Sequence, residues 1–148
     1  MIQRVQTLYL LSALALILIC CLMPIAVLAS SGPDLPVSLL ELTFRKSTKI
    51  LEFLTLFLLG YATFTNVLCI FLYKRRKTQM KQCMVNIFML IVLNLLVLVQ
   101  LLYLKNSGTT VTIHVILIFP LLAAVCTWLA YVRIKKDEEL VRSNDRLR

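Results

Sequence analysis

Long apolar runs separated by short polar connections are the main pattern of this chain. Four of them are nearly free of charge: residues 8–28, 51–73, 83–104 and about 111–132. Each covers roughly 21–23 residues, or about 32–35 Å as an α-helix, against a hydrocarbon core of about 30 Å. Apolar residues occupy nearly every face of these helices rather than one stripe. The pattern therefore predicts four membrane-spanning helices.

The connections predict how the helices are joined. Residues 30–50 open with a turn-rich run that ends the first helix, and residues 36–44 fit a short surface helix or a strand. Residues 105–108 (Lys-Asn-Ser-Gly) are a turn signal, so the third and fourth helices should form an antiparallel hairpin. Residues 133–148 hold neither Pro nor Gly and predict a helical extension. We expect one all-α domain over residues 1–148, a four-transmembrane-helix bundle with a helical cytoplasmic C-terminal extension.

The first apolar run also admits interpretation as a cleaved secretory signal. Arg4 precedes it, and residues 27–29 (Val-Leu-Ala) resemble a cleavage site. However, the run is longer than the usual core of about 7–15 residues, and Pro24 falls late inside it. We interpret it as a retained helix.

Composition supports the membrane assignment. Of 148 residues, 60% are hydrophobic, and the mean hydropathy is +0.89. A soluble fold of this size could not cover so much apolar surface with its few polar residues. The five cysteines form no Cys-x-x-Cys pair. They read as small buried hydrophobes, with no disulfide framework and no metal site.

The distribution of basic residues predicts the orientation. The formal net charge is +9, and twelve of the sixteen Lys and Arg residues fall on the side of the two termini. These are Arg4, Lys74, Arg75, Arg76, Lys77, Lys81, Arg133, Lys135, Lys136, Arg142, Arg146 and Arg148, against Arg45, Lys46, Lys49 and Lys105 on the other side. Short basic segments stay in the cytoplasm, so both termini should face it, with anionic lipid headgroups as counter-charge. No nucleic-acid-binding motif is present, and we expect no such partner.

Two ionisable residues fall inside the predicted spans. Glu52 and His114 both lie near the outer ends of their helices, where Glu52 can reach the headgroup zone or pair with Lys49. A Glu52–His114 pair that shuttles protons is a hypothesis that the sequence leaves open.

Uncharged polar residues near mid-span predict helix packing. Asn94 in the third helix lies at the depth of Tyr61, Thr63 and Asn66 in the second. Such groups most often form hydrogen bonds between helices rather than line a solute pathway. Small residues that would allow close helix approach are Gly60, Ala62, Ala123 and Ala124. Pro24 and Pro120 should kink their helices and leave carbonyls for a neighbour to satisfy.

No catalytic motif is present: the chain has no Ser/His/Asp set, no His-Glu-x-x-His and no glycine-rich phosphate loop. The sequence therefore gives no catalytic, cofactor-binding or metal-binding residue and no argument for an enzyme.

In the tail, Arg133–Asp137 and two further pairs have the i,i+4 spacing of helical ion pairs. The basic tail residues are candidate contacts for a partner or for anionic lipid: Arg133, Lys135, Lys136, Arg142, Arg146 and Arg148.

The most specific sequence lies at the two ends, MIQRVQTLYLL at residues 1–11 and IKKDEELVRSNDRLR at residues 134–148. They resemble the ends of an uncharacterised family of small four-helix inner-membrane proteins of Bacteroidetes-type bacteria. The resemblance implies a bacterial inner membrane and transfers no site residues. Three functions stay open: an accessory or scaffold subunit of a membrane complex, an oligomeric channel or transporter of a small solute, and a lipid-modifying membrane enzyme. We favour the first, whose partners would be other membrane proteins.

Overall fold

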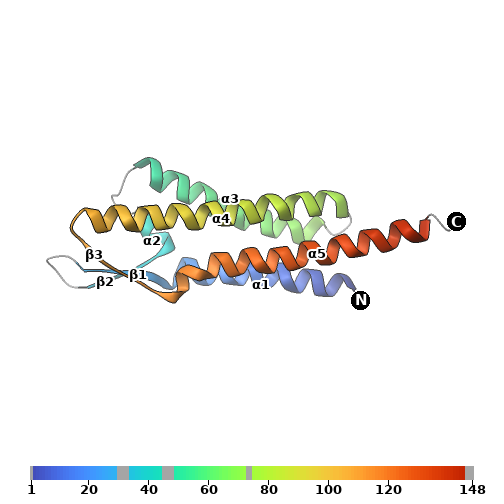
Figure 1. Ribbon diagram of the computed structural model, residues 1–148, viewed down its shortest axis with the longest axis horizontal. Coiled ribbons are helices and arrows are strands. Elements are labelled where there is room, and N and C mark those ends of the chain that lie inside the picture. Colours follow the sequence, from blue (N-terminus) through green and yellow to red (C-terminus); the bar gives the residue numbers. More distant parts are fainter. Residues whose placement is uncertain (1, 30–33, 45–48, 73–74, 146–148) are drawn as a thin grey trace.

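The computed structural model describes residues 2–29, 34–44, 49–72 and 75–145. Four long helices lie along one axis, with a small sheet at one end and the start of α1 and the end of α5 at the other (Figure 1). We call these the sheet end and the terminal end. The elements are α1 (Ile2–Leu22), β1 (Pro24–Ala29), β2 (Leu35–Ser38), α2 (Leu39–Phe44), α3 (Lys49–Phe71), α4 (Arg76–Asn106), β3 (Thr110–Ile113), the 3₁₀ turn η2 (Val115–Ile118) and α5 (Phe119–Asp145).

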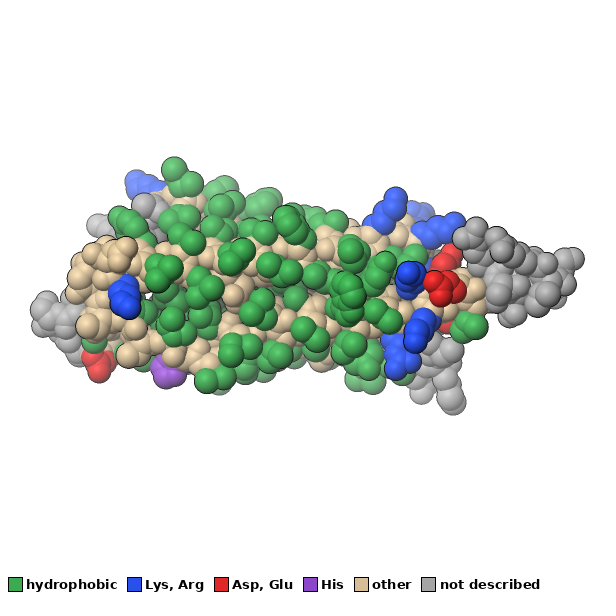
Figure 2. Space-filling model, in the orientation of Figure 1, with side chains coloured by type: hydrophobic (Ala, Val, Ile, Leu, Met, Phe, Trp, Pro, Cys, Tyr) green, Lys and Arg blue, Asp and Glu red, His purple; other side chains and the backbone are tan. Residues whose placement is uncertain are grey.

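Four segments of the described chain are long and apolar enough to cross a membrane. They are Val5–Leu22, Lys49–Phe71, Arg76–Asn106 and Val115–Val141. Hydrophobic side chains cover the middle of the molecule, and most charged ones gather near its ends (Figure 2). The prediction of four such helices is confirmed, and the chain has the makeup of a multi-pass membrane protein.

Two of the predicted helices are shorter than expected at the sheet end. The helix predicted over residues 8–28 ends at Leu22, because Pro24 has no N–H to continue the helical hydrogen bonds and opens β1 instead. The helix predicted over residues 111–132 begins only at Phe119. Its first residues belong to the β-branched run Thr-Val-Thr-Ile of β3, which favours a strand. The third helix, by contrast, begins at Arg76, well before the expected residue 83.

The sheet joins parts of the chain that are far apart in sequence. Its strand order is β2-β1-β3, with both pairings antiparallel. Val27 in the central strand lies opposite Pro36 on one side and Thr112 on the other. Pro36 is tolerated because β2 is an edge strand. The hydroxyl of Thr112 also donates to the Val27 carbonyl at 3.3 Å, which helps to hold β3 against β1.

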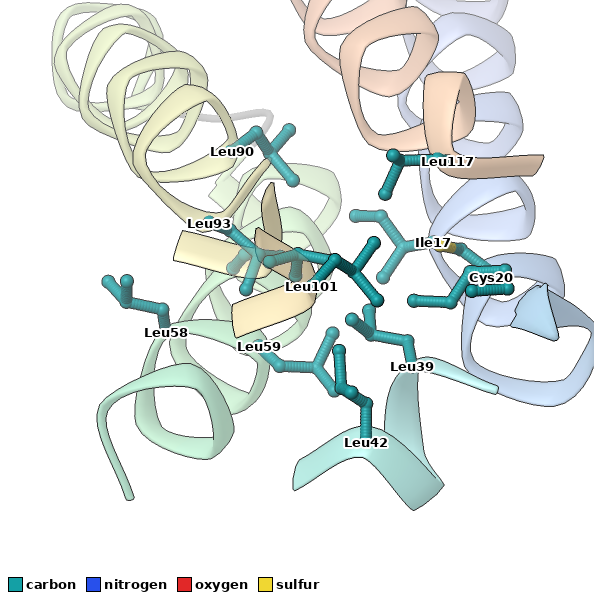
Figure 3. Packing of buried hydrophobic residues seen from close by; sticks show 14 of the residues in the cluster. Ile17, Cys20, Leu39, Leu42, Leu58, Leu59, Leu90, Leu93, Leu101 and Leu117 are labelled. Atoms are coloured by element: carbon teal, nitrogen blue, oxygen red, sulfur yellow. The ribbon is translucent and has the colours of Figure 1, made fainter. Parts of the chain in front are cut away.

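The short helix α2 closes the sheet end of the bundle. Ser38 and Glu41 cap it reciprocally: the Ser38 N–H donates to Glu41 Oε2 at 2.9 Å, and the Glu41 N–H donates to Ser38 Oγ at 3.3 Å. Leu39 and Leu42 then reach into the core beside Leu59 (Figure 3). The segment expected as a helix or a strand over residues 36–44 is thus a strand followed by a helix.

The hydrophobic core has two parts with a polar layer between them. The larger cluster fills the sheet end, and the smaller one consists of Leu10, Cys69, Cys83, Ala130 and Ile134. Between the clusters α3, α4 and α5 contribute buried polar residues that are at most 1% exposed: Thr65, Asn66, Asn86 and Thr127. α1 and α5 pack against one another, and each contributes a completely buried small residue, Ala13 and Ala123 respectively.

Candidate functional site

The two ionisable residues of the predicted spans lie on elements with different neighbours. Glu52 is partly buried in the first turn of α3, which packs against α4, α1 and α2. His114 is exposed between β3 and η2, and its backbone N–H donates to the Ile25 carbonyl at 2.9 Å. The start of α3 and the segment that follows β3 lie on opposite sides of the molecule (Figure 1). This arrangement does not support a Glu52–His114 proton shuttle.

Asn94 forms a hydrogen bond between segments, although its partner is not on the second helix. Its Nδ2 donates to the Leu117 carbonyl at 2.9 Å. Pro120 has no N–H to offer the Ile116 carbonyl, so the Phe119 N–H bonds to it in a 3₁₀ turn. Pro120 therefore lies in the first turn of α5 rather than at the expected kink, and Asn94 anchors the preceding turn to α4. Pro24 ends its helix rather than kinking it.

The mid-span residues singled out on the second helix do not bridge helices. The Thr63 hydroxyl donates to the Leu59 carbonyl and the Asn66 amide to the Ala62 carbonyl, both within α3. Tyr61 stacks on Phe57 of the same helix, with ring centroids 6.3 Å apart. Gly60 is exposed, and no atom lies within 4 Å of the point that a Cβ would occupy, so its expected role in close helix approach is wrong.

The hydrogen bonds that do join α3 to α4 involve residues that the sequence analysis missed. Thr65 Oγ1 donates to Asn86 Oδ1 at 2.9 Å, and Gln100 Nε2 donates to Thr55 Oγ1 at 2.8 Å. Gln79 Nε2 reaches the Cys69 carbonyl at 2.8 Å. A signal was present, because buried residues of α4 recur at alternating spacings of four and three: Gln79, Cys83, Asn86, Leu90, Leu93, Val97, Gln100 and Leu104. Three polar residues share that seam.

Some buried amide atoms in the described part of the chain have no hydrogen-bond partner. They are Gln6 Nε2, Asn66 Oδ1, Asn86 Nδ2 and Gln100 Oε1. In three of these side chains the other amide atom is hydrogen-bonded: Asn66 Nδ2, Asn86 Oδ1 and Gln100 Nε2. The polar layer is therefore only partly satisfied within this chain, and each unpartnered atom costs free energy.

The described residues include few groups suited to redox or metal chemistry. No cluster of three or more His, Cys, Asp or Glu side chains suited to a metal ion occurs there. Cys69 on α3 and Cys83 on α4 lie with their sulfurs 3.8 Å apart in the smaller core cluster. Both are free thiols.

A groove lies between α4 and α5 at the terminal end. Its volume is about 1040 Å³, close to the upper end of the range for small-molecule sites. One ion pair fixes how the two helices meet there: Arg76 Nη2 lies 3.4 Å from Asp137 Oδ2. Asp137 was expected to pair with Arg133 of its own helix, and it contacts α4 instead. The groove is lined by Lys77, Met80, Lys81, Met84, Val85, Tyr131, Lys135, Glu138, Glu139 and Val141.

The basic tail residues proposed as contacts divide into three groups. Lys135 lines the groove, while Arg133 and Lys136 are exposed elsewhere on α5. Arg142 belongs to α5, but its side chain lies outside the described residues, as do Arg146 and Arg148 entirely. Figure 2 shows basic and acidic side chains mixed at this end, next to the hydrophobic band.

Two apolar side chains follow the charged run 135–139 of α5. Leu140 is 59% exposed and Val141 is 43% exposed, and both follow the charged run 135–139 towards the end of the helix. In this part α5 extends past the other helices (Figure 1). Apolar exposure elsewhere on the long helices falls in the hydrophobic band, where lipid accounts for it.

The comparisons place the chain in a family without an assigned activity. The chain belongs to the DUF4293 family, a domain of unknown function, whose family model matches residues 2–147. Neither the curated proteins nor the solved structures compared with it gave a match. The resemblance to an uncharacterised family is therefore confirmed, and it assigns no role to any residue.

Proposed function

We propose that this chain is an accessory or scaffold subunit of a membrane protein complex in a bacterial cytoplasmic membrane. Its termini face the cytoplasm, and the end of α5 docks a partner. The observation that carries the proposal is the exposure of Leu140 and Val141 on the far side of a charged run.

Two physical arguments support this assignment. Lipid tails cannot cover Leu140 and Val141 if residues 135–139 mark the headgroup region, because charged side chains there would have to enter hydrocarbon first. Exposed apolar side chains rimmed by charges outside the bilayer are typical of protein interfaces. The twelve-to-four distribution of basic residues supports the cytoplasmic orientation.

The test is purification of an N-terminally tagged chain in mild detergent, with quantitative identification of co-purifying proteins. We expect a membrane protein in stoichiometric amount, and we expect Leu140→Ala to reduce its yield about ten-fold, as for a core interface residue. The matched control is Leu102→Ala, since Leu102 is also 59% exposed but lies in the hydrophobic band of α4. A monomer without a stoichiometric partner, or equal losses in both variants, would contradict the proposal.

A further inference from the structure

The α4–α5 groove changes in character along its length. Met84, Val85 and Tyr131 line the part nearer the sheet end, and Lys77, Lys135 and Glu138 line the part nearer the terminal end. The helices are antiparallel and held in register by Arg76 and Asp137. Met84 therefore lies about two turns, roughly 11 Å, deeper into the hydrophobic band than Lys77. A ligand that fits must be apolar at one end and charged at the other.

Three ammonium groups line this groove on the terminal side of Met84 and Val85. Lys77 and Lys81 are one turn apart on the same face of α4, and Lys135 faces them from α5. Lys77 also lies in the first turn of α4, where the free N–H groups of the helix add positive potential. A phosphate is the group that such a set attracts most strongly at the edge of a bilayer.

Two carboxylates stand beyond the lysines at the outer rim. Glu138 and Glu139 lie about one turn, roughly 5 Å, past Lys135 along α5. They disfavour a second negative charge on the ligand and favour a cation next to the phosphate. A primary ammonium suits them best, because it donates hydrogen bonds that a quaternary ammonium cannot.

We propose that this groove is a binding site for phosphatidylethanolamine. The phosphate lies among Lys77, Lys81 and Lys135, the ammonium contacts Glu138 and Glu139, and an acyl chain follows Met84 and Val85 into the bilayer. Phosphatidylglycerol supplies the phosphate without the cation, and phosphatidylcholine supplies a cation without N–H donors. The site goes beyond the docking role proposed above and stands without it. Val141 borders both surfaces, but the lipid contacts assigned here include neither Leu140 nor Val141.

The test compares lipids that differ only in the headgroup. The full chain, purified in detergent, is incubated with an equimolar mixture of phosphatidylethanolamine, phosphatidylglycerol and phosphatidylcholine of identical acyl chains, and retained lipid is measured by native mass spectrometry. We expect about ten-fold greater retention of phosphatidylethanolamine than of either other lipid, as for one charge-assisted contact.

Variants separate the two halves of the headgroup. The double variant Lys77→Gln/Lys135→Gln should lower phosphatidylethanolamine retention about ten-fold, and Glu138→Gln/Glu139→Gln should remove its advantage over phosphatidylglycerol. Exposed sheet-end residues give the controls Lys105→Gln and Asp34→Asn, which should change nothing. The thermal unfolding midpoint of each variant checks that it folds. If the glutamate double variant does not fold, Glu138→Gln alone replaces it.

Three results would overturn the proposal. The first is equal retention of the three lipids, which would mean that the groove does not discriminate between their headgroups. The second is a preference for phosphatidylglycerol, which makes the site one for anionic lipid only. The third is an undiminished phosphatidylethanolamine preference after both glutamates are replaced.

Discussion

Gln100 on α4 donates a 2.8 Å hydrogen bond to the hydroxyl of Thr55 on α3, and both side chains are completely buried. The Thr55 hydroxyl in turn donates a hydrogen bond to the Leu51 carbonyl at 2.8 Å, so it both donates and accepts. This pair joins the two helices near the sheet end, where both side chains are shielded from the surroundings of the bundle.

A double-mutant cycle on this pair measures its contribution. Thr55→Val should lower the free energy of unfolding by about 1–2 kcal/mol, because Gln100 keeps a buried amide without its acceptor. Gln100→Met should cost a similar amount, and the double variant should cost less than the sum by about 1 kcal/mol. Reversible unfolding in mixed micelles gives these values. The control is Thr63→Val, whose hydroxyl bonds only within α3; strictly additive costs at Thr55 and Gln100 would show that the two residues do not interact.

The thiols of Cys69 and Cys83 allow a direct test of how α3 packs on α4. Their sulfurs are 3.8 Å apart, so a membrane-permeant oxidant should link them within one chain once Cys20, Cys21 and Cys126 are replaced by Ala. Each thiol gives up its hydrogen to the oxidant as the sulfur–sulfur bond forms. Mass spectrometry of the intact monomer detects the loss of the two thiol hydrogens. Cys69→Ala in the same background provides the control. Oxidised dimers with no intrachain bond would contradict the α3–α4 register.

The number of spans could be predicted from the sequence, whereas the sheet could not be predicted from apolar content alone. Residues 24–29 and 110–113 are as apolar as many helical residues, and a window that averages hydropathy assigns them to the adjacent helix. Local chemistry held the missing information: Pro24 breaks the helix, and the run from Thr110 to Ile113 is β-branched. Ser38 and Glu41 have the spacing of a capping box, which marks the start of α2.

The buried face of α4 could be predicted from the sequence, whereas the α4–α5 groove could not. On α4, Gln79, Asn86 and Gln100 mark the buried seam, because polar side chains in a spanning helix turn away from lipid. The groove depends on contacts between residues near 77 and residues near 135, which nothing in the sequence brings together. The Arg76–Asp137 ion pair was hidden for the same reason, since Arg133 offered a nearer partner along the helix.

The two described glycines should respond oppositely to substitution by alanine. Gly108 ends α4 with a φ of 88°, a conformation in which an L side chain is strained, so Gly108→Ala should lower the free energy of unfolding by about 1 kcal/mol. Gly60 lies inside α3 with open space around it, so Gly60→Ala should raise stability by up to about 1 kcal/mol. Each variant is the control for the other, because an added methyl meets no atom within 4 Å at either position. Destabilisation by Gly60→Ala would show that α3 is packed closely at that point.

Single cysteines at the two ends of α4 test the proposed orientation. Ser107 and Thr78 are both exposed, and they lie at the sheet end and the terminal end respectively. In a background with the native cysteines replaced by Ala, a membrane-impermeant maleimide added to intact spheroplasts should label Ser107→Cys and spare Thr78→Cys. Permeabilised spheroplasts should show both variants labelled. The basic residues around position 78 hold that end in the cytoplasm, which the maleimide reaches only after the membrane is opened. Labelling of Thr78→Cys alone in intact spheroplasts would show that the orientation is the reverse of the proposed one. The α4–α5 groove and Leu140 would then lie outside the cytoplasm, while the packing of the helices would be unchanged.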